Sequence, residues 1–144
     1  MTGAAVLYTP AVLGLATSLA RWPWREDLPL RGEARSPACG STVRLALETD
    51  SAGRIAELGL RASACAIGQA AAALFAEGAV GKTRGEIAEA EAALSAWLAD
   101  QGAEPAWPGL AVLTAARSYP ARHGAILLAW KAALAALPSA AERG

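Results

Sequence analysis

The chain has 144 residues with 13 basic and 13 acidic side chains, so its formal net charge at pH 7 is zero. This length suits one domain over residues 1–144, and the neutral balance argues against a nucleic-acid partner, because such binding depends on neutralising phosphates. No apolar run reaches the roughly 18 to 20 residues that span a bilayer, so we expect no membrane partner. No basic residue precedes the first apolar stretch, as a secretion signal would require, and we therefore expect a cytoplasmic protein.

The first segment predicts a helix. Thr9 and Pro10 have the residue types of an N-cap and a first helical position, and apolar residues then recur at helical spacing. Pro23 is expected to end this helix, since proline cannot continue one. The flanking Trp22 and Trp24 are interpreted as closing the edge of the core, with an exposed aromatic pair for a partner as the alternative.

Three strand patterns follow. Residues 28–36 alternate weakly between small or apolar and charged side chains, and residues 41–48 alternate clearly. The cluster Thr-Asp-Ser-Ala-Gly at 49–53 is typical of a turn, and residues 54–62 alternate again. Two strands of similar length around a short turn predict an antiparallel hairpin, and the segment before it makes a three-stranded sheet.

The second half predicts helices. Residues 64–77 are apolar nearly all round, which indicates a buried helix, and Gly78 is expected to end it. Thr83 and Glu86 have the spacing of a capping box for the next helix. The remaining helical segments are expected at 82–100, 110–120 and 121–138, with a frayed tail at about 138–144. Strands followed by helices predict an α+β fold, a three-stranded antiparallel sheet with helices packed on one face.

The two cysteines of the chain, Cys39 and Cys65, flank the predicted hairpin. Cys39 falls in the turn between the first two strands, and Cys65 follows the third strand at the start of the buried helix. In an antiparallel meander these two points lie at the same end of the sheet, so the thiols are expected to approach one another. With no secretion signal, free thiols are favoured over a disulfide. Thiolates are soft ligands for iron, iron–sulfur clusters and zinc, but four ligands are usual for such sites, and buried cysteines also serve as small core residues.

The segment SPACGSTVRLALETDSAGRIAELGLRASACAIGQAAA resembles the core of the NifU/IscU-type iron–sulfur cluster assembly scaffolds, which include the SufU branch. That family has a Cys-Gly-Asp turn, a hairpin, a second cysteine opening a helix, and a third at the start of the last long helix. In the SufU branch the last helix reads like PAR-x-x-C-A-x-L-A-W, and this chain has PARHGAILLAW at 120–130. The resemblance implies a non-catalytic scaffold that receives sulfur from a cysteine desulfurase, takes up iron, builds a [2Fe–2S] cluster and passes it to recipient proteins.

Carried over residue by residue, the resemblance matches Cys39 and Cys65 to the first two family cysteines. Ser41 stands where the family has its aspartate, and Ala125 stands where it has its third cysteine. His123, the only histidine, lies two residues before Ala125 and is a candidate third ligand, because imidazole replaces thiolate on iron or zinc in some proteins. The candidate cluster- and metal-binding residues are therefore Cys39, Cys65 and His123.

Three hypotheses remain from the sequence. The first is a scaffold that binds iron or a [2Fe–2S] cluster through Cys39 and Cys65, as a monomer or weak homo-oligomer, with missing ligands borrowed from a second subunit or from glutathione. The second is a sulfur acceptor for a cysteine desulfurase, either zinc-dependent or with one thiol carrying persulfide. The third is a homologue that no longer binds metal and acts as an interaction module. None of the three is an enzyme in its own right.

Overall fold

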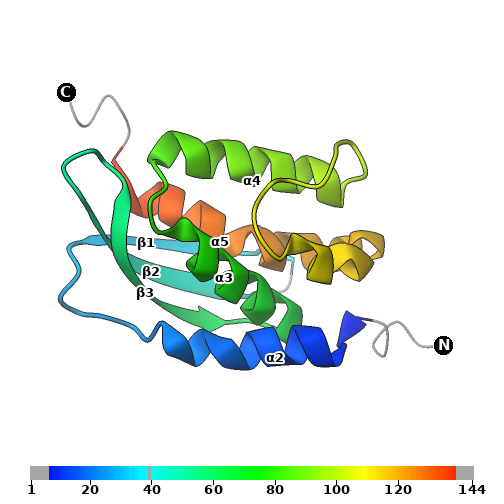
Figure 1. The fold of residues 1–144 in the computed structure, drawn as a ribbon. Coiled ribbons are helices and arrows are strands. Elements are labelled where there is room, and N and C mark those ends of the chain that lie inside the picture. The colour runs from blue at the N-terminus through cyan, green and yellow to red at the C-terminus, as the bar shows by residue number, and fades with distance from the viewer. Residues whose placement is uncertain (1–6, 39, 139–144) are drawn as a thin grey trace.

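The computed structural model describes residues 7–38 and 40–138, and within them one antiparallel sheet is covered by a layer of helices (Figure 1). The sheet has the order β1-β2-β3, as the sequence predicts. None of the described helices is long and apolar enough to cross a membrane. The strands and helices, in chain order, are α2 (Pro10–Ser18), η1 (Leu19–Arg21), β1 (Leu30–Arg35), β2 (Thr42–Thr49), β3 (Ile55–Ser63), α3 (Ala66–Ala79), α4 (Arg84–Leu98), η2 (Leu110–Ser118), η3 (Pro120–Arg122) and α5 (His123–Ala136).

The helices cover one face of the sheet, and the other face carries none (Figure 1). Helix α5 packs on β1 and β2, α3 packs on α5 and β3, α2 lies against α3, and α4 lies against α5. The alternation of the strands explains this arrangement, because it places Val43, Leu45 and Leu47 on the covered face, where they are at most 1 % exposed. The fold is therefore the α+β fold predicted from the sequence.

The predicted helix starts are confirmed by their caps. Thr9 Oγ1 accepts a hydrogen bond from Val12 N at 3.2 Å, which caps α2. Thr83 and Glu86 form a complete capping box at α4, with Glu86 N donating to Thr83 Oγ1 at 3.2 Å. Each cap satisfies backbone N–H groups that the first helical turn leaves without an intrahelical partner.

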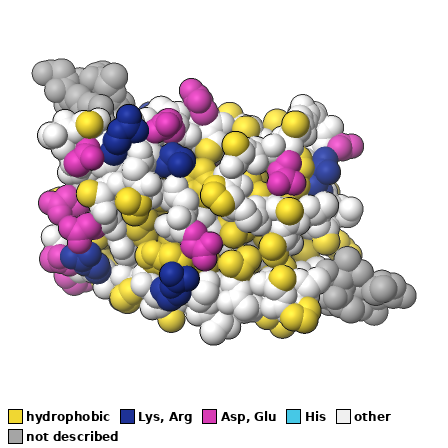
Figure 2. Space-filling view, in the orientation of Figure 1, with side chains coloured by type: hydrophobic (Ala, Val, Ile, Leu, Met, Phe, Trp, Pro, Cys, Tyr) yellow, Lys and Arg dark blue, Asp and Glu magenta, His cyan; other side chains and the backbone are white. Residues whose placement is uncertain are grey.

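The centre of the helical layer is an aromatic cluster. Trp130 of α5 is fully buried, and its ring meets Phe75 of α3 and Trp107 edge-on, with ring centroids 5.3 Å apart in both pairs. Phe75 and Trp107 stack with centroids 5.6 Å apart. Around this cluster, alanines let the helices approach closely, and the surface of the helical face mixes hydrophobic side chains with charges of both signs (Figure 2).

Three local predictions are wrong in detail. Helix α3 runs past Gly78 to Ala79, and Gly78 is instead a packing position, because a Cβ there would lie 2.6 Å from Nε1 of Trp107. The segment after 110 is a 3-10 helix that ends at Ser118. The first helix ends before Pro23, because α2 stops at Ser18 and only a 3-10 turn, Leu19–Arg21, follows it. The role of Gly78 is decided by its contact with Trp107, which is distant in the chain, and a local sequence pattern does not contain that information.

Gly32 provides a test of the sheet–helix packing. A Cβ at this position of β1 would overlap the backbone oxygen of Ala132 and lie 2.5 Å from Ala136 N of α5. We expect Gly32→Ala to lower the free energy of unfolding by about 1–3 kcal/mol, because the helix backbone must move away from the sheet. The matched control is Gly14→Ala, in α2, where a Cβ meets nothing within 4 Å, and which is expected to raise stability by about 0.5–1 kcal/mol. Chemical denaturation measures the free energy of unfolding of both variants. Equal stabilities would contradict the close approach of β1 to the backbone of α5.

Candidate functional site

The register of the sheet brings the predicted cysteine-bearing segments to one end of the strands. We call this end, where β1 and β3 end and β2 begins, the cysteine edge. Arg35, the last residue of β1, pairs with Thr42 at the start of β2, and Thr42 pairs with Ser63 at the end of β3. The β1–β2 turn and the segment that leads into α3 therefore lie side by side, as expected from the sequence. Cys39 itself lies outside the described residues.

The β1–β2 turn is closed by its own backbone. Ser36 N donates to the backbone oxygen of Ser41 and Gly40 N donates to that of Ser36, both at 2.8 Å. Gly40 has a φ of +72°, in the left-handed region that side chains disfavour, so a glycine at this position is required by the turn. Ser41, in the place of the family's aspartate, is only 6 % exposed.

Cys65 lies at the N-cap of α3 with extended backbone angles, φ −63° and ψ 167°. Its side chain makes no capping hydrogen bond, its thiol is free, and the residue is half-buried against the core. It opens onto a shallow, mostly polar pocket of about 310 Å³, which is also lined by Gly40, Ser41, Ser63 and Ala64. The pocket therefore joins the free thiol of Cys65 to the turn that contains position 39.

The position of the family's third cysteine is filled by a packed alanine. Ala125, in the first turn of α5, is 1 % exposed. It lies against Gly68, one turn along α3 from Cys65, where a Cβ would be 3.3 Å from that of Ala125 and 3.0 Å from that of Ala64. Three small residues thus close the space between the two helices beside the Cys65 pocket.

His123 begins α5 and is held by the end of η2. Its Nε2 lies 3.0 Å from the backbone oxygen of Ala116 and 3.2 Å from that of Arg117. Carbonyl oxygens only accept hydrogen bonds, so Nε2 carries the proton and has no lone pair for a metal. A ligand role for His123 would have to use Nδ1, and this residue does not line the Cys65 pocket.

Ser36 is a feature of this edge that sequence reasoning did not single out. It is 2 % exposed, its hydroxyl has no hydrogen-bond partner among the described residues, and it lies where a Cβ on Gly124 would come within 2.6 Å of Oγ. Burying a hydroxyl without a hydrogen-bond partner lowers the stability of the fold. The hydroxyl of Ser36 therefore remains free to donate a hydrogen bond to a group bound beside the turn. Serine is common in turns, and only its burial distinguishes this one.

The described residues contain no group of three His, Cys, Asp or Glu side chains that could hold a metal ion, and Cys39 is not among those residues. A cation bound by Cys65 would therefore draw on position 39 and on ligands from outside the described part of the chain. Thiolates at such a site would bind iron, zinc or copper(I) rather than magnesium or calcium.

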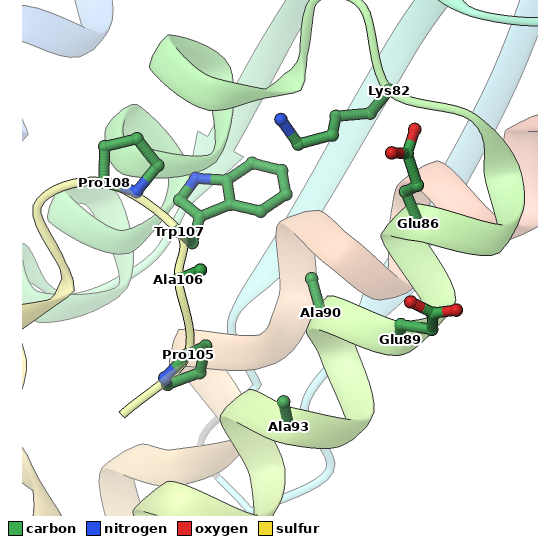
Figure 3. Close-up of a pocket in the computed structure, with 9 residues that line it drawn as sticks. All are labelled: Lys82, Glu86, Glu89, Ala90, Ala93, Pro105, Ala106, Trp107 and Pro108. Atoms are coloured by element: carbon green, nitrogen blue, oxygen red, sulfur yellow. The ribbon is translucent and has the colours of Figure 1, made fainter. Parts of the chain in front are cut away.

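A larger pocket, of about 340 Å³, lies at the other end of α3 from Cys65 (Figure 3). The indole of Trp107 forms one wall, with Lys82 Nζ 5.4 Å from its ring centroid and Glu86 on the facing helix α4. A hydrogen bond from Thr83 N lowers the pKa of Glu86 below its usual value. No cysteine or histidine lines this pocket, so it is separate from the thiol site.

The fold and the edge site together define a class: small α+β domains with a thiol at the start of a helix beside the sheet edge. A sequence model of the NifU-like N terminal domain matches residues 23–125, which is most of the chain. The chain therefore belongs to the NifU-like N-terminal domain family. No curated protein matches it.

Solved structures agree with this assignment. The N-terminal part of a nitrogen-fixing NifU-like protein from Brucella abortus is 26 % identical with a TM-score of 0.84, and the match covers 94 % of each chain. A candidate iron–sulfur cluster assembly scaffold protein for the SUF system from Fervidobacterium islandicum AW-1 is 22 % identical with a TM-score of 0.80, covering 92 % of this chain and 98 % of that one. At that identity the second structure shows the shared fold alone.

Proposed function

We propose that this protein is a non-catalytic scaffold of iron–sulfur cluster assembly, which receives iron and sulfur at the Cys65 edge and passes a [2Fe–2S] cluster on. The observation that carries the proposal is the free, half-buried thiol of Cys65, which opens onto a pocket shared with the β1–β2 turn in a chain of the NifU-like family. The proposed ligands from this chain are Cys39 and Cys65, and the iron and the cluster are cargo. The proposed location is the cytoplasm.

Two thiolates are half of the four protein ligands that a [2Fe–2S] cluster usually has. Ala125 has no donor atom and is packed against α3, and Nε2 of His123 is engaged by two carbonyl oxygens. The missing ligands are therefore proposed to come from outside the chain, either from a second copy of the protein or from a small thiol such as glutathione. An incomplete ligand set also suits a carrier that must release its cluster.

The second candidate is a sulfur acceptor that works with a single thiol, and the partial exposure of Cys65 favours it. The Cys65 thiolate would attack the terminal sulfur of a persulfide on the cysteine desulfurase. A new S–S bond forms on Cys65, the donor's S–S bond breaks, and its electron pair stays on the donor's cysteine as thiolate. This reaction is redox-neutral and needs no metal, although a zinc ion at the site would be compatible with it.

The experiment that separates these functions uses protein purified without oxygen and reconstituted with ferric iron and sulfide in the presence of glutathione. Iron, zinc and sulfide are measured for the parent protein and for Cys39→Ser and Cys65→Ser. We expect iron and sulfide in near-equal amounts in the parent and neither in the two variants, since a cluster needs both thiolates at once. The control is Ser63→Ala. Ser63 lines the same pocket but is not a proposed ligand, so this variant should keep the parent's iron content.

Other results of the same experiment contradict the scaffold. If the parent holds zinc alone, or holds no metal but accepts labelled sulfur from a desulfurase with only one cysteine required, the sulfur acceptor is the function. If the parent holds neither metal nor sulfur, the site is inactive and only an interaction role remains.

A further inference from the structure

The face of the sheet opposite the helices carries two cross-strand pairs of like charges. Toward the β2–β3 turn, Glu48 pairs directly with Glu57, and four residue pairs nearer the cysteine edge Arg44 pairs directly with Arg61. Like charges opposite each other in antiparallel strands are destabilising, and exchanging one glutamate with one arginine would relieve both pairs. Arg25 offsets the acidic pair through an ion pair with Glu57 at 2.7 Å, and Glu33, opposite Arg44 on β1, approaches the basic pair at 3.9 Å.

The basic part of this face is built around Trp24. The guanidinium carbons of Arg31, Arg44 and Arg61 lie 5.7, 4.8 and 5.7 Å from the centroid of its ring. The segment before β1 crosses the sheet here, because Leu60 N donates to the backbone oxygen of Trp22, and Gly59 leaves room for Pro23. Trp24 thus lies on the outer face, not at the core edge as predicted, whereas Trp22 packs against the core.

These cations are only partly neutralised. Arg31 pairs with Glu26 at 3.2 Å, and Arg44 approaches Glu33 at 3.9 Å, with all four side chains exposed. Arg61 and Arg35 form no ion pair with any residue in the described ranges 7–38 and 40–138. The arginine face, defined as Arg31, Arg35, Arg44 and Arg61 around Trp24, is thus a surface with surplus positive charge. A notch of about 210 Å³ beside Trp24 hollows its centre, and Glu33 lines this notch together with Arg31 and Arg44.

The arginine face is continuous with the thiol site. Arg35 pairs with Thr42, and Thr42 with Ser63, which lines the Cys65 pocket. A partner protein that brings a reacting atom to Cys65 from the sheet side would therefore lie against the arginine face. By contrast, the helical face drawn in Figure 2 intersperses its basic and acidic side chains.

We propose that the arginine face docks an acidic segment of the protein that delivers sulfur to Cys65, a cysteine desulfurase, and so orients the donor at the site. The inference rests on the proposed function for the identity of the donor. Carboxylates of the donor would pair with Arg61 and Arg35, the two arginines of this face that form no ion pair within the described residues. Opposite charge on facing surfaces raises the association rate and fixes the orientation of partners.

The test is a charge exchange that leaves net charge unchanged, Glu48→Arg with Arg61→Glu. Each of the two like-charged pairs then becomes a pair of opposite charges, with Glu57 facing an arginine and Arg44 facing a glutamate, so the thermal midpoint should stay level or rise. The affinity for the source organism's cysteine desulfurase, measured by calorimetry at low salt, should fall at least about tenfold. The parent's affinity should also weaken with added salt more steeply than the variant's.

The matched control exchanges charges on the helical layer, Glu91→Lys with Lys131→Glu, which reverses an existing ion pair of 3.2 Å and should keep the parent's affinity. Equal desulfurase affinity in the parent and the sheet variant would overturn the proposal, as would loss confined to a cluster-recipient protein. Reconstitution with iron and inorganic sulfide needs no donor, so the sheet variant should retain it. The parent protein could fail to take up iron and sulfide in this reconstitution and still bind the desulfurase through the arginine face. That result would refute the scaffold function and leave the docking surface standing.

Discussion

Replacing Ala125 with cysteine is expected to slow the loss of iron from the reconstituted protein at least about tenfold, because the variant adds a third thiolate to a two-thiolate site. Position 125 lies in the first turn of α5 against Gly68, one turn along α3 from Cys65. Gly68 has no side chain and Ala64 a short one, so the added sulfur has small neighbours. The decay of visible absorption after addition of a chelator measures the rate.

The control for this gain is Ala125→Ser, which adds an oxygen of similar size at the same buried place but a much weaker ligand for iron. It should lose iron at the parent's rate. If the cysteine and serine variants behave alike, position 125 does not face the bound iron, and the alignment of α5 with the family's third cysteine is wrong for this chain.

Trp130→Ala is expected to lower the free energy of unfolding by about 3–5 kcal/mol, the range for removing a buried tryptophan. Trp130 is fully buried and holds Phe75 and Trp107 edge-on, so its loss leaves a cavity where α3, α5 and the 99–109 loop meet. For a chain of this size, the thermal midpoint should fall by roughly 10–20 °C. Calorimetry or thermal circular dichroism measures it.

Trp130→Phe is the matched variant, and its cost should be less than half as large. Nε1 of Trp130 is buried without a hydrogen-bond partner among the described residues, so phenylalanine removes an unsatisfied donor while it keeps most of the ring contacts. Equal losses for the two variants would contradict the view that ring packing, rather than the indole nitrogen, stabilises this cluster.

The fold could be predicted because its signals are local. Alternation in residues 41–48 and 54–62 fixed which face of β2 and β3 is buried, and the Thr83–Glu86 spacing located the start of α4. The prediction that Gly78 ends α3 is wrong because glycine serves both at helix ends and at close packing contacts. A helix end and a close contact look alike in sequence, and only the position of Trp107, far along the chain, distinguishes them.

The site could be predicted in part. Strand order alone placed Cys65 and the β1–β2 turn at one edge, and the registers confirm that edge. The hydrogen bonds of His123 to the carbonyls of η2 were not predictable, because that segment was expected to be an ordinary short helix. The gathering of arginines around Trp24 depends on cross-strand register and on a loop that crosses the sheet, and neither is visible in a single strand's pattern.

The most direct test of the central claim is a native mass spectrum of the protein reconstituted with iron and sulfide in the presence of glutathione. The account predicts the added mass of a [2Fe–2S] cluster on the folded protein. Because the chain is proposed to supply two thiolates, that mass should appear with either a second chain or bound thiol, and it should be absent from Cys65→Ser. A folded parent protein that carries no iron or sulfide, or a single chain that holds the cluster with no external ligand, would contradict it.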